Sequence, residues 1–173
     1  DIKDYSGNVS FPNNFPKGTT HKGCTVSDLQ NFITSLHESS IYVIGRISVF
    51  QDPSYTSLFP ELAVKSKASG GVWKDRKGLS FVDVGAKPYW DYILQISRAS
   101  YEMGFDELNF DYIRYPSDGD MSDTDFTWTG TSTRAAMLES FFSYLHDNLK
   151  ESGVMLSADL FGMTTTVTND MGI

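Results

Sequence analysis

The segment from Gly104 to Pro116, GFDELNFDYIRYP, most constrains the fold, because it has the pattern of a buried strand and yet carries charge. Side chains alternate across a strand, so one face of this segment is apolar and contains Leu108, Phe110 and Tyr112. The other face contains Glu107, Asn109 and Asp111. Burying a polar group without a partner costs about 2 to 7 kcal/mol. A polar face that meets a ligand avoids this cost.

Helix and strand patterns alternate along the rest of the chain. Apolar residues at helical spacing predict helices at residues 25–39, 87–103 and 132–152. β-branched and aromatic runs predict strands at residues 41–50 and 154–161, and residues 1–7 resemble the end of another strand. A long connection, residues 51–87, contains a short predicted helix near residues 60–67. Such alternation is typical of right-handed βαβ units with a parallel sheet.

The polar faces of the strands favour a barrel over an open sheet. Arg46 and Ser48 share one face of their strand, as do Ser157 and Asp159. Helices cover both faces of an open doubly wound sheet, whereas the inner face of a (β/α)8 TIM barrel can be polar near the carboxyl ends of its strands. A complete barrel takes roughly 250 residues. We therefore expect residues 1–173 to be a single domain, a partial barrel with about strands 2 to 5.

Composition limits the partners of the chain. Its 14 Lys and Arg against 22 Asp and Glu give a net charge of -8, which disfavours nucleic acid and anionic membranes and favours a neutral or cationic ligand. Aromatic residues make up 14% of the chain, which suits either a large core or a sugar-stacking surface. No apolar run of about 18 residues predicts a transmembrane segment. We expect no cofactor, and the oligomeric state stays open.

Several segments resemble a known family. IYVIGRISVFQDP, GFDELNFDYIRYPSDG, LSADLFG and TNDMGI are similar to a bacterial family of glycoside hydrolase (β/α)8-barrel domains that was first catalogued as a domain of unknown function. The resemblance covers most of the chain, and its FDYIRYP core is specific. DIKDYSG resembles the second barrel strand of the family. The resemblance implies a barrel that acts on a polysaccharide, with the strands beyond the fifth missing here, and a secreted or cell-envelope location.

The motif also has a more distant resemblance to the fourth-strand signature of chitinase-type barrels. Asn109 and Arg114 stand where that signature has Asp and Glu, so the sequence does not support chitinase-like substrate-assisted chemistry. Asp111 alone carries over. Glycoside hydrolysis requires two carboxyl groups, and we predict Asp111 and Asp159, each near the carboxyl end of a strand, as the catalytic pair. The alternatives are a structural pair between Asp111 and an arginine, and a loop anchor for Asp159.

Seven further residues are candidates for substrate binding: Asn109, Arg114, Arg46, Asp4, Tyr115, Trp73 and Trp128. Arg46 is expected to pair with Asp111 or Glu107, and Arg114 to orient Asp111 or bind a substrate oxygen. The three aromatic residues follow loop patterns and suit stacking on sugar rings. For Asp4 the alternative is a solvated acid in a loop.

Residues 118–125 place oxygen ligands at alternate positions but lack the glycine and the distal glutamate of a calcium loop, so no metal is assigned. The sequence thus predicts a glycoside hydrolase that uses paired carboxylates. One alternative is a non-catalytic carbohydrate-binding barrel that has lost its acid pair. Another is a flavodoxin-like or receiver-like domain whose acidic strand ends hold a metal or phosphate, and the polar strand faces count against it.

Overall fold

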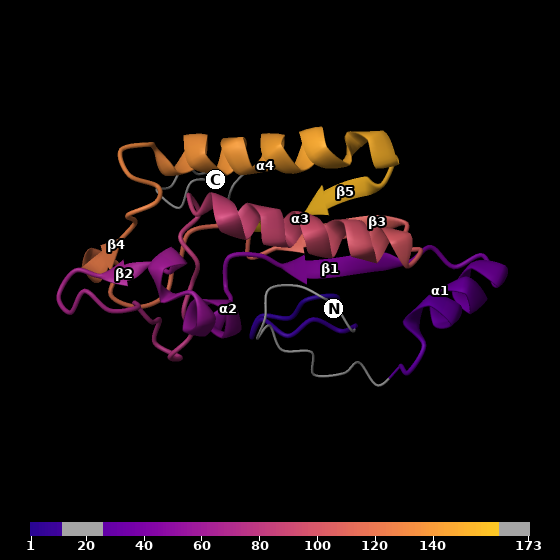
Figure 1. The fold of residues 1–173 in the computed structure, drawn as a ribbon, viewed down its shortest axis with the longest axis horizontal. Helices are drawn as coiled ribbons and strands as arrows, with labels where there is room; N and C mark the ends of the chain where they lie inside the picture. Colours follow the sequence, from indigo (N-terminus) through magenta and orange to yellow (C-terminus); the bar gives the residue numbers. More distant parts are fainter. Residues whose placement is uncertain (12–25, 163–173) are drawn as a thin grey trace.

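The computed structural model describes residues 1–11 and 26–162. Figure 1 shows the helices and strands in chain order. They are α1 (Leu29–Glu38), β1 (Ile44–Ser48), α2 (Pro53–Leu58), η1 (Pro60–Leu62), β2 (Lys65–Ser66), α3 (Lys87–Glu102), β3 (Glu107–Asp111), η2 (Met121–Asp123), β4 (Thr124–Asp125), α4 (Arg134–Leu149), η3 (Lys150–Ser152) and β5 (Met155–Ala158). The predicted alternation of strands and helices is confirmed.

The main sheet is parallel, as predicted, with the order β1-β3-β5. The N-terminal segment lies beside β1, because Lys3 forms a parallel bridge with Ile47. The Ile2 amide donates to the Arg46 carbonyl at 2.7 Å, and the Ser48 amide donates to the Lys3 carbonyl at 2.9 Å. The N-terminal segment, β1, β3 and β5 are therefore neighbours in chain order, as consecutive barrel strands would be.

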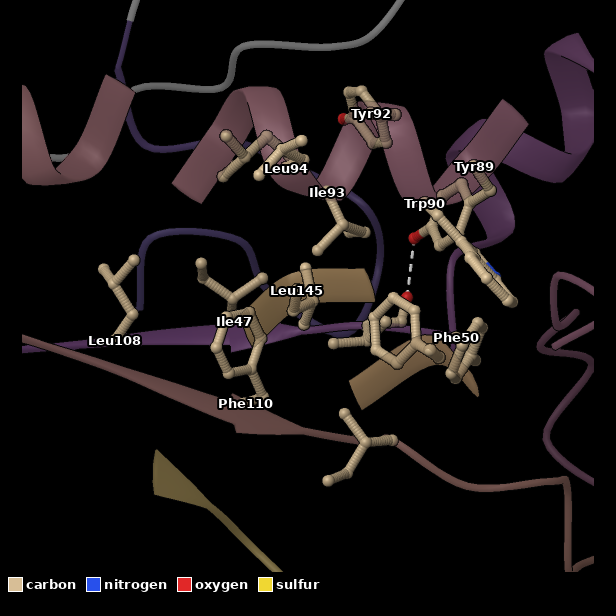
Figure 2. Packing of buried hydrophobic residues seen from close by; sticks show 14 of the residues in the cluster. Ile47, Phe50, Tyr89, Trp90, Tyr92, Ile93, Leu94, Leu108, Phe110 and Leu145 are labelled. Carbon is tan, nitrogen blue, oxygen red and sulfur yellow. Dashed lines mark hydrogen bonds between the residues drawn. The ribbon is translucent and has the colours of Figure 1, made fainter. Parts of the chain in front are cut away.

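The helices α3 and α4 pack on the apolar face of this sheet. Figure 2 shows Ile47, Leu108 and Phe110 of the strands beneath side chains of α3. Leu145 of α4 lies in the same buried cluster. Leu108 and Phe110 are 0% and 2% exposed, while the residues that alternate with them are only partly buried. The two-faced pattern predicted for β3 is confirmed at these two positions.

Local signals account for the limits of the helices. The Asp28 side chain caps α1 by accepting from the Asn31 amide at 3.0 Å, and residue 25, where the predicted helix begins, lies outside the described residues. The Thr133 hydroxyl caps α4. Gly104 follows α3 with φ +104°, a left-handed conformation that glycine adopts without the steric penalty of a side chain. The predicted limits of these helices are therefore correct to within a few residues.

The long connection differs from its prediction. The helix predicted near residues 60–67 is absent, and α2 begins earlier, at Pro53, while residues 60–62 form only a 3-10 turn. Asp52 and Pro53 supply the cap and the first helical position, and Pro60 stops continuation of the helix. β2 then pairs antiparallel with β4, which joins the connection to the loop after β3.

A buried ion pair connects the N-terminal segment with α2 and α3. Lys3 Nζ lies 3.0 Å from Asp52 Oδ2, and both side chains are fully buried. Lys3 also donates to the Ser48 carbonyl at 2.7 Å, and Asp52 Oδ1 accepts from the Tyr55 amide at 2.8 Å. The Tyr89 hydroxyl of α3 lies 3.0 Å from Asp52 Oδ2. Burial, and then the Asp52 charge, raise the pKa of Tyr89 well above its ordinary value.

We predict that replacing Lys3 by Met lowers the free energy of unfolding by about 3 to 5 kcal/mol, because Asp52 is left as a buried charge without its cation. Urea unfolding followed by circular dichroism measures this change. The control is Lys150→Met, which breaks the exposed 3.1 Å pair with Asp147 and should alter stability by less than about 1 kcal/mol. Equal effects of the two variants would contradict the prediction.

Candidate functional site

Polar side chains meet at the carboxyl ends of the parallel strands. Arg46 of β1 bonds Asp111 of β3 through Nη2, and its Nη1 lies 3.0 Å from Asp1 Oδ1. The other Asp111 oxygen accepts from the Tyr112 amide at 2.6 Å. The predicted pairing of Arg46 with Asp111 is confirmed. Asp1, an acid of the N-terminal segment that was not among the predicted site residues, belongs to the same group.

A second group lies across β3 and β5. Asn109 Nδ2 donates to Ser157 Oγ at 3.1 Å and to Asp159 Oδ1 at 3.2 Å. Glu107 accepts from Ser157 and from the Tyr42 hydroxyl, so of the two expected partners of Arg46 it is Asp111 that forms the pair. Register explains this, because Arg46 lies opposite Asn109 and reaches the Asp111 end of β3.

Asp111 and Asp159 occupy neighbouring positions on adjacent strands. Phe110 pairs with Ala158 in the parallel register, and the Asp159 amide donates to the Phe110 carbonyl at 2.8 Å. Adjacent strands lie roughly 4.8 Å apart. Retaining glycosidases separate their two carboxyl groups by about 5 to 5.5 Å and inverting enzymes by about 6.5 to 9.5 Å. The register therefore places Asp111 and Asp159 side by side at the carboxyl end of the sheet.

Tyr112 departs from the predicted alternation. Sequence reasoning assigned it to the apolar, helix-facing side, but its φ of +50° interrupts the alternation one residue after β3. Its ring instead lines a cleft that it shares with Arg114. The only sequence signal for this change is the position of Tyr112 just beyond a strand end. A non-glycine residue in this conformation is uncommon and frequently occurs at functional sites.

Arg114 does not bond Asp111, although orienting Asp111 was one of the two roles predicted for it. Its Nη1 donates to the Tyr115 carbonyl at 3.2 Å and to Ser117 Oγ at 2.9 Å. The guanidinium carbon lies 5.3 Å from the Tyr112 ring centre and 4.7 Å from that of Phe161. Burial lowers the pKa of Arg114, and the nearby Tyr112 and Asp111 only partly offset this effect.

The cleft has a volume of about 440 Å³ and opens at the carboxyl end of the sheet. Tyr5 of the N-terminal segment lines it, together with Gln51 and Tyr112, which follow β1 and β3 respectively. Its opposite wall comes from residues 75–81 of the long connection. In (β/α)8 barrels the loops at this end of the strands build the active site.

The structure buries two of the three aromatic candidates. Tyr115 is 0% exposed, and its hydroxyl lies 2.8 Å from Thr129 Oγ1. Burial raises the pKa of Tyr115 to about 12. Trp73 is 3% exposed, and its Nε1 donates to the Asp120 carbonyl at 3.1 Å. Loop patterns predicted exposure, but both rings pack inside the folded loops, where a sugar has no access to them.

Trp128 is exposed, as predicted, but lies apart from the cleft. It is 42% exposed, and its Nε1 donates to the Glu61 carbonyl at 2.8 Å. Its amide donates to Asp83 at 2.8 Å, and Asp83 also accepts from the Thr129 hydroxyl at 2.7 Å. The buried Asp83 carboxylate thus holds the loop that carries Trp128, a role that the sequence pattern did not predict.

Asp4 organises a turn in the N-terminal segment. Its Oδ1 accepts from the Ser6 amide at 2.8 Å, from the Ser6 hydroxyl at 2.7 Å and from the Asn8 amide at 3.1 Å. Burial alone raises the pKa of Asp4, but the hydrogen bonds from Ser6 and Asn8 outweigh this effect and lower it below the ordinary 3.8. Asp4 therefore positions the turn that carries Tyr5 of the cleft.

The acids at residues 118–125 do not converge on a common point. Asp118 Oδ1 lies 3.5 Å from Arg76 Nε, Asp120 caps η2, and Asp123 accepts from the Ala68 amide at 2.8 Å. Within residues 1–11 and 26–162, no group of three or more His, Cys, Asp or Glu side chains could hold a metal ion. In the same ranges, no helix has the length and apolar character needed to cross a bilayer.

We predict that Asp4→Asn lowers the melting temperature at pH 7 and that the difference from the wild type shrinks towards about pH 2. The folded pKa is below the unfolded value of 3.8, so the charge of Asp4 stabilises the fold fully above 3.8 and progressively less as pH falls through the folded pKa. Thermal unfolding at several pH values measures this. Glu38→Gln, at an exposed position on α1, is the control and should show no such trend. A difference that is constant with pH would refute the prediction.

Comparison with known proteins places this geometry in a family. A family profile described as "Putative glycosyl hydrolase domain" matches residues 1–173. The crystal structure of a hypothetical protein from Ruminiclostridium thermocellum is 35% identical, with a TM-score of 0.80, over 94% of this chain and 82% of that one. A search of curated proteins finds no match to this chain.

More distant structures share the fold. An α-L-fucosidase from Paenibacillus thiaminolyticus has a TM-score of 0.66 at 14% identity, over 91% of this chain and 26% of that one. A maltogenic α-amylase from Thermotoga neapolitana has a TM-score of 0.53 at 14% identity, over 76% of this chain and 28% of that one. The chain therefore spans about a quarter of the length of these two glycosidases.

Proposed function

This chain belongs to the family described as "Putative glycosyl hydrolase domain", and from that premise we propose that it hydrolyses glycosidic bonds of a polysaccharide. The observation that carries the proposal is the placement of Asp111, the last residue of β3, beside Asp159, which directly follows β5, on the polar face and at the carboxyl end of the sheet. Two carboxyl groups so arranged can act on the two sides of a glycosidic bond.

We assign different roles to the two acids. Arg46 and the Tyr112 amide each hold one oxygen of Asp111, which suits a fixed carboxylate facing the anomeric carbon. We assign the protonation of the leaving oxygen to Asp159, which is exposed at the strand end and is positioned by a hydrogen bond from Asn109. Water supplies the hydroxyl that the anomeric carbon gains and the proton that replaces the one given to the leaving group. Arg46 and Asn109 act as positioning residues.

The scaffold of the proposed enzyme is a (β/α)8 barrel that residues 1–173 cover in part. Support comes from the neighbouring order of the N-terminal segment, β1, β3 and β5, and from the packing of α3 and α4 on the apolar face. The glycosidase structures named above share this fold and are much longer. Because a polysaccharide does not enter cells, we also propose a secreted or cell-envelope location.

One observation favours a second function, carbohydrate binding without catalysis. Both oxygens of Asp111 already have partners, Arg46 and the Tyr112 amide. A carboxylate held in this way would serve a purely structural pair equally well. Such a barrel would bind glycans and release no sugar.

We predict that Asp111→Asn reduces the release of reducing sugar from a polysaccharide panel by roughly 100-fold or more, because the variant lacks the carboxylate at the anomeric carbon. Asp147→Asn, on the exposed surface of α4, is the matched control and should keep full activity. Circular dichroism checks that both variants fold. Unchanged sugar release by Asp111→Asn would reject the assignment, and glycan binding by a wild type that releases no sugar would establish the binding function instead.

A further inference from the structure

We propose that the cleft beside the carboxylates binds an acidic sugar unit, with the guanidinium of Arg114 holding the carboxylate of a uronic acid. The inference rests on the proposed function, because it names the substrate class of the same site. Arg114 and Tyr112 line this cleft and immediately follow the strand that ends at Asp111. The cleft therefore lies at the end of the strand that carries Asp111.

Arg114 has hydrogen-bond donors that no described residue uses. Only its Nη1 is engaged, by the Tyr115 carbonyl and Ser117 Oγ, and no carboxylate of the described residues forms an ion pair with it. Its guanidinium is nevertheless partly removed from water, which lowers its pKa. Asp111 offsets only part of this effect, and its own oxygens are bonded by Arg46 and the Tyr112 amide. A ligand carboxylate would satisfy the two remaining nitrogens with parallel, charge-assisted hydrogen bonds.

Two tyrosines complete the recognition of a sugar. Tyr112 lines the cleft in a left-handed conformation, which is strained for a tyrosine and persists only where the surrounding structure imposes it. Tyr5 is 54% exposed on another part of the lining, and Gln51 Nε2 donates to its carbonyl at 3.2 Å. Aromatic rings suit the apolar faces of pyranose rings. The cleft thus combines stacking surfaces with a cation.

The charge of the cleft differs from that of the whole chain. The net charge of -8 favours neutral or cationic ligands in general, but the two acids of the cleft already have partners. Asp75 Oδ1 accepts from the amides of Lys77 and Leu79 at 2.9 and 2.8 Å, and Asp118 pairs with Arg76. The cations that line the cleft are Arg114 and Lys77. An anionic group therefore fits beside Arg114, with which neither acid of the lining forms an ion pair.

The test measures binding by isothermal titration calorimetry in the Asp111→Asn protein, so that hydrolysis does not interfere. The ligands are short oligomers of galacturonate, glucuronate and mannuronate, each paired with its neutral methyl ester, and a sulfated oligosaccharide. We expect one acid oligomer to bind at least roughly 10-fold more tightly than its ester. Adding Arg114→Gln should weaken the binding of the acid oligomer by roughly 10- to 100-fold and leave the binding of the ester unchanged. Arg114→Lys should restore part of the loss.

Arg98→Gln, an arginine of α3 whose Nη2 donates to the Asn148 carbonyl, is the matched control and should bind like its parent. Each of three outcomes would overturn the proposal. The acid and the ester of every pair could bind with equal affinity, Arg114→Gln could weaken the binding of acid and ester equally, or the protein could prefer the sulfated ligand. If the wild type also releases sugar from neutral glycans, and Asp111→Asn does not, the hydrolase function stands without this subsite. If no glycan is bound or cleaved, both proposals fail.

Discussion

The position of the site depends on the buried ion pair between Lys3 and Asp52. Burying two charges is costly unless further hydrogen bonds satisfy both groups. Here Lys3 donates to the Ser48 carbonyl, and Asp52 accepts from the Tyr55 amide. The pair connects the N-terminal segment to the first turn of α2 and, through Tyr89, to α3. Residues on both sides of Lys3 reach the site, since Asp1 bonds Arg46 and Tyr5 lines the cleft. A core interaction therefore determines where the surface chemistry lies.

A second buried acid, Asp83, holds the long connection and the loop after β3 together. Asp83 accepts hydrogen bonds from the amides of Gly85, Trp128 and Thr129, so it joins the long connection to the loop after β3. A Cβ atom on Gly85 would lie 2.4 Å from the Trp128 carbonyl oxygen, which explains why glycine stands at this close approach. Together with the pairing of β2 and β4, this contact supports the far wall of the cleft. Buried carboxylates thus organise loops that lack regular secondary structure.

Sequence patterns predicted the elements that rest on local periodicity. The helices α3 and α4 and the strand β3 lie within a few residues of their predicted bounds, because each shows an apolar face at a regular spacing and a clear stop signal. The same alternation separated Leu108 and Phe110 from Asn109 and Asp111. Strand parity also brought Arg46 to Asp111. These predictions hold because short-range periodicity persists wherever an element packs against a continuous core.

The sequence by itself determined the parallel βαβ order, the apolar and polar faces of β3, and Asp111 as a carboxylate at a strand end. Only the tertiary structure decided that Tyr112 lines the cleft with Arg114 and that Tyr115 and Trp73 are buried. It also decided that Glu107 accepts a hydrogen bond from Ser157. The physical reason is range: alternation and capping are contacts between near neighbours in the chain. A left-handed residue, a buried loop aromatic and the hydrogen bond from Ser157 to Glu107 depend on partners that are distant in sequence.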